Sequence, residues 1–274
     1  MKKKAFVQII PALLFFVLFS LCFVRGNVLD VLKSIPYSGF GGYWFTFVLF
    51  EMFCVYFTAS LIGRYTKPVA VDFILLICSM LGVLWLNVSS REGWVYNLLC
   101  MENLAKYIQF FTFGILCRKY NKQFMSLVNN DIFRAIVISG FIICFYLYYD
   151  EALYNANRIL FALNHDIIVR YLGLLTLFIF FCMKSEYFNK DSALTRCMLF
   201  VGRRTLDIYL LHFFFLPKLL FLTPYLEPTR MMLVQLSLSL IVAALVVGLC
   251  LLVSEVIRSS NILAYICFGV KRKI

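Results

Sequence analysis

One short stretch of the chain gathers most of its chemically capable side chains. Residues 201–212 read Val-Gly-Arg-Arg-Thr-Leu-Asp-Ile-Tyr-Leu-Leu-His. On a helix, residues three, four and seven apart share a face, so the spacing places Thr205, Tyr209 and His212 in one polar stripe. Histidine suits proton transfer near neutral pH. We therefore regard His212 and Tyr209 as candidate catalytic residues, with a packing role as the plainer alternative for a histidine in an apolar segment.

Two adjacent arginines stand at the start of the same stretch. Arg203 is four residues before Asp207, and this spacing predicts an ion pair between them. Guanidinium groups suit phosphate recognition. Arg203 and Arg204 are thus candidate substrate-binding residues, and Thr205 beside them is a third. The alternative is that the two arginines only mark the cytoplasmic end of a membrane helix.

Other ionisable side chains interrupt long apolar segments. A charge in hydrocarbon costs at least about 2.5–3.5 kcal/mol, so each of them invites a functional question. Glu51 is near the middle of its segment and is a candidate catalytic residue, whether protonated, paired with an arginine or part of a polar cavity. Arg170 and His165 stand close together near the end of another segment and are candidate substrate-binding residues. Asp72 and Arg134 are near segment ends, where snorkelling allows a structural role.

The composition requires a lipid-facing surface. Of the 274 residues, 63% are hydrophobic and 15% are charged, and the mean hydropathy is +0.89. A membrane span needs about 20 mostly apolar residues. Eight windows approach or meet that length: Ala5–Val24, Tyr43–Ile62, Val69–Val88, Leu104–Cys117, Ile132–Tyr149, Ile167–Met183, Thr205–Leu222 and Met231–Val253. The sequence predicts an all-α polytopic transmembrane helix bundle of about eight spans, in which Leu104–Cys117 is the shortest window.

The basic residues predict the orientation of the bundle. Lysine and arginine gather in cytoplasmic segments, and residues 2–4, 64–67, 118–122, 184–204 and 258–273 hold most of them. The segments expected on the outside hold few basic residues: Arg25, Lys33, Arg91, Lys106, Arg158 and Arg230. Both termini are therefore expected to be cytoplasmic, in a multi-pass protein of the inner (cytoplasmic) membrane. The net charge of +12 then reflects this asymmetry and attraction to anionic membrane lipid, and nucleic-acid binding is not expected.

The remaining sequence features indicate one domain over residues 1–274 without a metal site. The ten cysteines lie mostly inside the apolar windows and form no C-x-x-C pair. They are expected to act as small packing residues, and neither a zinc site nor a disulfide framework is predicted. The segment Asp150–Asp166 is predicted to be an external loop that contains His165.

Three motifs resemble the acyltransferase 3 family of membrane-bound O-acyltransferases. The strongest match is to a pattern close to G-[RK]-x-[ST]-L-x-I-Y-L-x-H, formed here by Gly202, Arg203, Thr205, Leu206, Ile208, Tyr209, Leu210 and His212. Residues 43–50 are similar to the family's Trp-Phe-x-x-x-Leu helix, and residues 110–118 to its Phe-Phe-x-x-Gly helix end. The resemblance implies transfer of an acetyl or other acyl group from acyl-CoA to a hydroxyl of a cell-envelope polysaccharide or glycolipid. It implies acyl-CoA as a donor substrate and no bound cofactor.

The sequence also departs from that family. Members carry, in their first segment, a histidine associated with acyl transfer, whereas the two histidines here are His165 and His212. The chain is therefore expected to lack the family's opening helices, as a fragment, through a late start codon or as a degenerate relative. Two other functions stay open. One is a transporter or flippase-like protein for a lipid-linked glycan, and the other is a catalytically inactive subunit that works with a partner chain or by self-association.

Overall fold

The computed structural model describes residues 2–24, 27–38, 40–65, 68–88, 93–148, 158–189, 191–216 and 232–269. Over these ranges the regular structure is helical and contains no strand, which confirms the predicted all-α class. The chain divides into two compact units. Unit 1 comprises Met1–Phe50 and Ala193–Ile274, and unit 2 comprises Glu51–Ser192.

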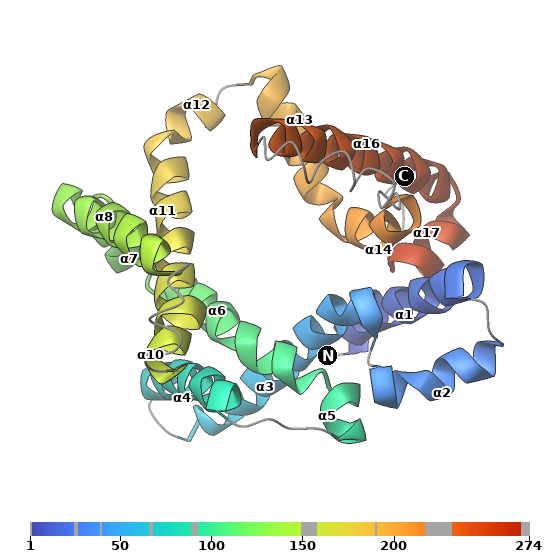
Figure 1. Cartoon of the computed structure of the whole chain (residues 1–274), viewed down its shortest axis with the longest axis horizontal. Coiled ribbons are helices and arrows are strands. Elements are labelled where there is room, and N and C mark those ends of the chain that lie inside the picture. Colours follow the sequence, from blue (N-terminus) through green and yellow to red (C-terminus); the bar gives the residue numbers. More distant parts are fainter. Residues whose placement is uncertain are drawn as a thin grey trace. The chain divides into compact units, whose positions relative to one another are not determined.

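Unit 1 joins helices from both ends of the chain (Figure 1). Its elements are α1 (Lys2–Phe19) with the π-helical turn η1 (Ser20–Val24), α2 (Val28–Ser38), the 3₁₀ turn η2 (Gly41–Tyr43), the start of α3 (Trp44–Ile62), α13 (Ala193–Arg203), α14 (Thr205–Phe215), α16 (Met232–Ser259) and α17 (Asn261–Phe268). α14 packs on α16, and α1 packs on both α14 and α17. Aromatic rings fill the contact, with Phe15 against Phe214 and Phe268.

Unit 2 holds the remaining helices of the chain (Figure 1). They are the rest of α3, α4 (Pro68–Val88), α5 (Trp94–Leu98), α6 (Met101–Lys119), α7 (Asn121–Val128), α8 (Asp131–Tyr148), α10 (Arg158–Ala162), the π-helical turn η3 (Leu163–Ile168), α11 (Val169–Met183) and α12 (Ser185–Asn189). α4 packs on α6, and α8 packs on α11. A buried cluster of Val128, Val137 and Ile179 joins α7, α8 and α11, because each of these helices turns an apolar residue toward the others.

Five helical segments of the described chain are long and apolar enough to cross a membrane. They are Phe6–Phe23, Gly41–Ile62, Val69–Leu86, Ile159–Met183 and Leu233–Ser259. A sixth arises if α7 and α8, which meet at a bend of 75°, count as one span. Each of the eight predicted windows overlaps a helix, but α6 carries several charges and α14 has only 11 residues. The count of eight spans thus stays a prediction.

Some sequence predictions fall outside the described residues. They concern Tyr149, residues 150–157 of the predicted external loop, residues 217–222 of the seventh window and Met231. The same holds for several charges used for the orientation, namely Arg25, Lys67, Arg91, Lys190, Arg230 and residues 271–273. The cytoplasmic placement of both termini likewise stays a prediction.

The predicted external loop Asp150–Asp166 is wrong over its second part. Residues 158–166 are helical, and they continue through η3 into α11. Two side-chain hydrogen bonds to neighbouring helices hold this polar segment in a helical conformation. The Asn164 amide donates to the Cys144 carbonyl oxygen at 3.2 Å, and the Gln109 amide donates to the Asp166 carbonyl oxygen at 3.4 Å. Polar groups of this segment, which suggested a loop in the sequence, therefore form hydrogen bonds with neighbouring helices.

Gly269 ends α17 in a conformation that requires glycine. Its φ is +65°, and a Cβ there would lie 2.8 Å from the Cα of Val7 in α1. Backbone atoms cannot move aside as a side chain can, so Gly269→Ala is expected to destabilise the protein by about 1–3 kcal/mol. Thermal unfolding in detergent measures the loss. The control is Gly248→Ala in α16, where a Cβ meets nothing within 4 Å. Equal midpoints for the two variants would contradict this account of unit 1.

Candidate functional site

The predicted polar stripe lies on α14. Thr205, the first residue of this helix, donates its hydroxyl to the Gly202 carbonyl oxygen at 3.3 Å. Tyr209 and His212 follow at the spacing that puts all three on one face of the helix. The local geometry that the sequence predicted for these residues is therefore present. Their predicted roles depend on what each side chain contacts.

The His212 ring is held in one tautomer. Its Nδ1 is 2.7 Å from the carbonyl oxygen of Tyr209. A carbonyl oxygen only accepts hydrogen bonds, so Nδ1 carries the hydrogen and donates it. In the neutral ring Nε2 then bears a lone pair. The ring also packs on Phe213, with centroids 3.9 Å apart. This arrangement equips His212 to accept a proton at Nε2.

His212 lines a cavity of about 540 Å³ between α14 and α16. Most of the lining is aliphatic, and the polar members besides His212 are Gln235 and Ser239. The Ser239 hydroxyl is already used, since it donates to the Gln235 carbonyl oxygen at 2.7 Å. His212 is the one ionisable side chain among the described residues of this lining. An apolar pocket with one such group is the usual form of a small-molecule site.

Tyr209 ties α14 to the start of α3. Its hydroxyl donates to the Gly42 carbonyl oxygen at 2.8 Å and accepts from the Phe45 amide at 3.0 Å. The Tyr43 hydroxyl donates in the opposite direction, to the Leu210 carbonyl oxygen at 3.2 Å. These bonds join segments more than 160 residues apart in sequence. They hold the helix that carries His212 in place, and the catalytic role predicted for Tyr209 stays a prediction.

Asp207 is the most deeply buried acid of unit 1, with 1% of its surface exposed. Arg258 of α16 donates two hydrogen bonds to its carboxylate, from Nε at 2.7 Å and from a terminal nitrogen at 2.8 Å. The Ser254 hydroxyl donates to the same carboxylate at 2.5 Å. The predicted Arg203–Asp207 pair is wrong. The facing helix α16 supplies a planar fork that matches both carboxylate oxygens, whereas Arg203 is exposed.

The two adjacent arginines have different surroundings. Arg204 contacts Asp207 at 3.5 Å and donates to Glu255 at 2.5 Å, so its guanidinium is engaged within the protein. Arg203 is exposed and has no carboxylate within ion-pair distance in the part of the chain that the structure describes. Of the two, Arg203 is therefore the one with a charge to offer a ligand.

In unit 2, His165 and Arg170 meet through a third residue. The carboxylate of Asp166 is 3.1 Å from His165 Nδ1 and 2.7 Å from a terminal nitrogen of Arg170. Asp166 is 5% exposed, and the Phe161 ring stacks on His165. The sequence reasoning grouped His165 with Arg170 but missed Asp166. The four-residue spacing from Asp166 to Arg170 was the signal that points to it.

The other ionisable groups at membrane depth differ in how well they are paired. Asp72 is buried and pairs with Lys119, and it also accepts from the Tyr56 hydroxyl at 3.2 Å. Arg134 donates to the Val128 carbonyl oxygen at 2.7 Å, which agrees with a structural role. One carboxylate oxygen of Glu51 is buried and accepts no hydrogen bond from any described residue. Glu51 belongs to unit 2, and its predicted catalytic role stays a prediction.

Comparison with known proteins gives one match. A family model described as "Acyltransferase domain" matches residues 5–255 of the chain. The matched range extends across both units and contains every candidate catalytic and substrate-binding residue predicted from the sequence. Comparison with curated proteins found no match, and neither did comparison with solved structures.

The ion pair at Asp207 predicts a sharp effect on stability. Asp207→Leu leaves the largely covered guanidinium of Arg258 without its carboxylate partner, and we expect a loss of about 3 kcal/mol in the free energy of unfolding. The double variant Asp207→Leu/Arg258→Met removes both charges and is expected to recover most of that loss. Glu255→Gln is the control, because half-exposed Glu255 contributes about 0–1 kcal/mol. Denaturation in detergent measures all three, and a double variant as weak as the single one would contradict this role.

Proposed function

The chain belongs to the acyltransferase 3 family, and from this premise we propose that it is a membrane O-acyltransferase. It transfers an acetyl or other acyl group from acyl-CoA to a hydroxyl of a cell-envelope polysaccharide or glycolipid. The observation that carries the proposal is the family match over residues 5–255. The membrane-capable helices support it, since a protein that spans the membrane has access to a donor on one side and an acceptor on the other.

The reaction is the exchange of a thioester for an ester. The acceptor hydroxyl oxygen attacks the thioester carbonyl carbon, the new C–O bond forms, and the C–S bond to coenzyme A breaks. The hydroxyl proton passes to a base and then to the departing thiolate, so no external oxidant or reductant is needed. His212 supports the role of base, because Nε2 bears the lone pair while Nδ1 donates to Tyr209. That donated hydrogen bond also stabilises the imidazolium that forms.

The donor is expected to enter from the cytoplasm. The proposal includes eight spans with both termini inside, in the inner membrane, which places Arg203 at the cytoplasmic end of α14. Its exposed guanidinium suits the phosphates of acyl-CoA. On the same orientation His165 and Arg170 are near the outer surface, where they suit the hydroxyl groups of a glycan acceptor.

His212→Ala tests the proposed base. We expect turnover in acyl transfer to fall by about 10²–10⁴-fold, because a general base contributes that much. The measurement uses purified protein in vesicles, radiolabelled acetyl-CoA and an envelope glycan fraction, with thermal unfolding as a check on folding. Full activity of His212→Ala would remove His212 from the reaction. Loss of activity in His165→Ala alone would place the base in unit 2, and glycan movement without acylation would favour a transporter.

Arg203 and Arg204 form a matched pair for the donor site. Arg203→Gln is expected to raise KM for acyl-CoA about tenfold with kcat little changed, since it removes a contact present in both the ground state and the transition state. Added salt should reduce the difference from the wild type. Arg204→Gln is expected to lower thermal stability instead, because Arg204 contacts Asp207 and Glu255. An unchanged KM in Arg203→Gln contradicts the phosphate role.

A further inference from the structure

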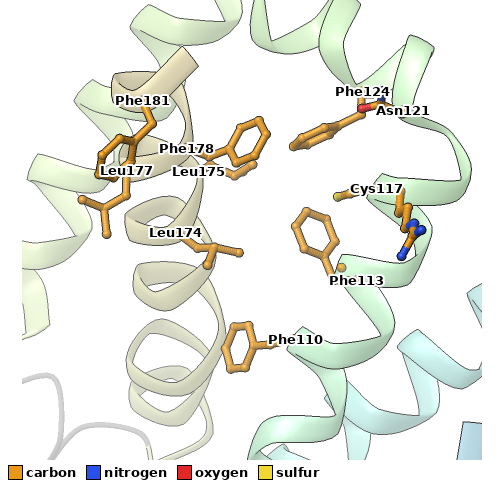
Figure 2. A pocket seen from close by; sticks show the side chains of 12 residues that line it. Phe110, Phe113, Cys117, Asn121, Phe124, Leu174, Leu175, Leu177, Phe178 and Phe181 are labelled. Atoms are coloured by element: carbon orange, nitrogen blue, oxygen red, sulfur yellow. The ribbon is translucent and has the colours of Figure 1, made fainter. Parts of the chain in front are cut away.

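Unit 2 contains a cavity of about 720 Å³ that the proposed acyl-transfer chemistry does not use. It lies between α6 and α7 on one side and α11 on the other (Figure 2). Rings of Phe110, Phe113, Phe124 and Phe178 face the space, and leucines of α11 complete the wall (Figure 2). Its size is within the range of about 300–1,000 Å³ that is usual for small-molecule sites. The wall of α11 belongs to a membrane-capable segment, so lipid is a natural source of ligands.

The aromatic walls are fixed by contacts with one another. The Phe124 ring lies 5.1 Å from Phe178 and 6.3 Å from Phe113, measured between centroids. Phe124 also packs on the buried cluster around Val128, which holds α7 against α11. At Gly114, a Cβ would meet nothing within 4 Å. The absence of a side chain there leaves part of the space open.

Polar groups occur at one end of this cavity. Arg118 and Asn121 are lining residues there, at the junction of α6 and α7. Asn121 is labelled in Figure 2. Lys119, the next residue, is paired with buried Asp72. Arg118, by contrast, has neither a carboxylate nor another hydrogen-bond partner among the described residues. The cavity therefore combines a long apolar wall with one uncompensated guanidinium and one amide at its end.

We propose that this cavity binds one acyl chain of an anionic phospholipid, with the lipid phosphate against Arg118 and Asn121. The apolar aromatic wall fits a hydrocarbon chain, and arginine with an amide donor fits phosphate oxygens. An uncompensated cation favours a head group with net negative charge over a zwitterionic one. A single arginine also matches one phosphate better than the several phosphates of coenzyme A. On the proposed orientation, the lipid comes from the cytoplasmic leaflet.

A matched pair of glycine variants tests the site. Gly114→Leu places a side chain in the open part of the cavity. Gly82→Leu is the control: it makes the same substitution on α4, outside the cavity, where a Cβ also meets nothing within 4 Å. Each full-length protein is placed in nanodiscs with equal amounts of phosphatidylglycerol and phosphatidylcholine, and mass spectrometry of the released protein counts the retained lipids. The wild type and Gly82→Leu are expected to retain one phosphatidylglycerol. Gly114→Leu is expected to retain at least about tenfold less.

Arg118→Gln tests the head-group contact without filling the cavity. Because Arg118 is exposed, this variant is expected to fold, and its preference for phosphatidylglycerol over phosphatidylcholine should fall about tenfold. Equal retention in the wild type and in Gly114→Leu overturns the proposal. Equal retention of the two lipids by the wild type also overturns it. Displacement of the retained lipid by palmitoyl-CoA, but not by lysophosphatidylglycerol, would instead assign the cavity to a long-chain acyl donor.

Discussion

Asp207 and Arg258 form the contact on which the candidate site depends. An ionised carboxylate that is 1% exposed costs several kcal/mol unless cations and hydrogen-bond donors surround it. Arg258 and Ser254, both on α16, supply those partners within 2.8 Å. The contact therefore sets the register of α14 against α16. His212 is on α14, and the cavity that it lines lies between α14 and α16. The geometry of that cavity therefore depends on the ion pair.

Unit 2 meets the same constraint twice. Asp72 of α4 pairs with Lys119 of α6, and Asp166 pairs with Arg170 within one helical segment. Both aspartates are 5% exposed. These ion pairs keep the buried aspartates from destabilising the fold. Groups whose hydrogen-bonding or ion-pairing capacity is unmet by the described residues are the first candidates for contact with a ligand. In unit 2 an oxygen of Glu51 and the guanidinium of Arg118 are among these groups.

The sequence predicted what depends on neighbours along one helix. Hydropathy located a helix in each of the eight apolar windows, and the spacing of three and four residues placed Tyr209 and His212 on one face. It failed where the partner comes from another segment. The same rule paired Asp207 with Arg203, although Arg258, 51 residues away, makes the contact. The motif around Gly114 was visible as a resemblance to a family. The cavity beside it is completed by α11, and no pattern within residues 110–118 predicts that a helix so far along the chain packs there.

Unit 1 is discontinuous in sequence, and this has a consequence for biosynthesis. Helix α1 packs on α14 and α17, where Gly269 lies against Val7. All of Glu51–Ser192 is translated between these partners. At about 5–20 residues per second, α1 waits roughly ten to fifty seconds for its contacts with α14 and α17. During that interval its apolar surface faces lipid or the insertion machinery, while unit 2 already has its whole sequence. All of unit 2 is therefore synthesised before the two halves of unit 1 are able to pack together.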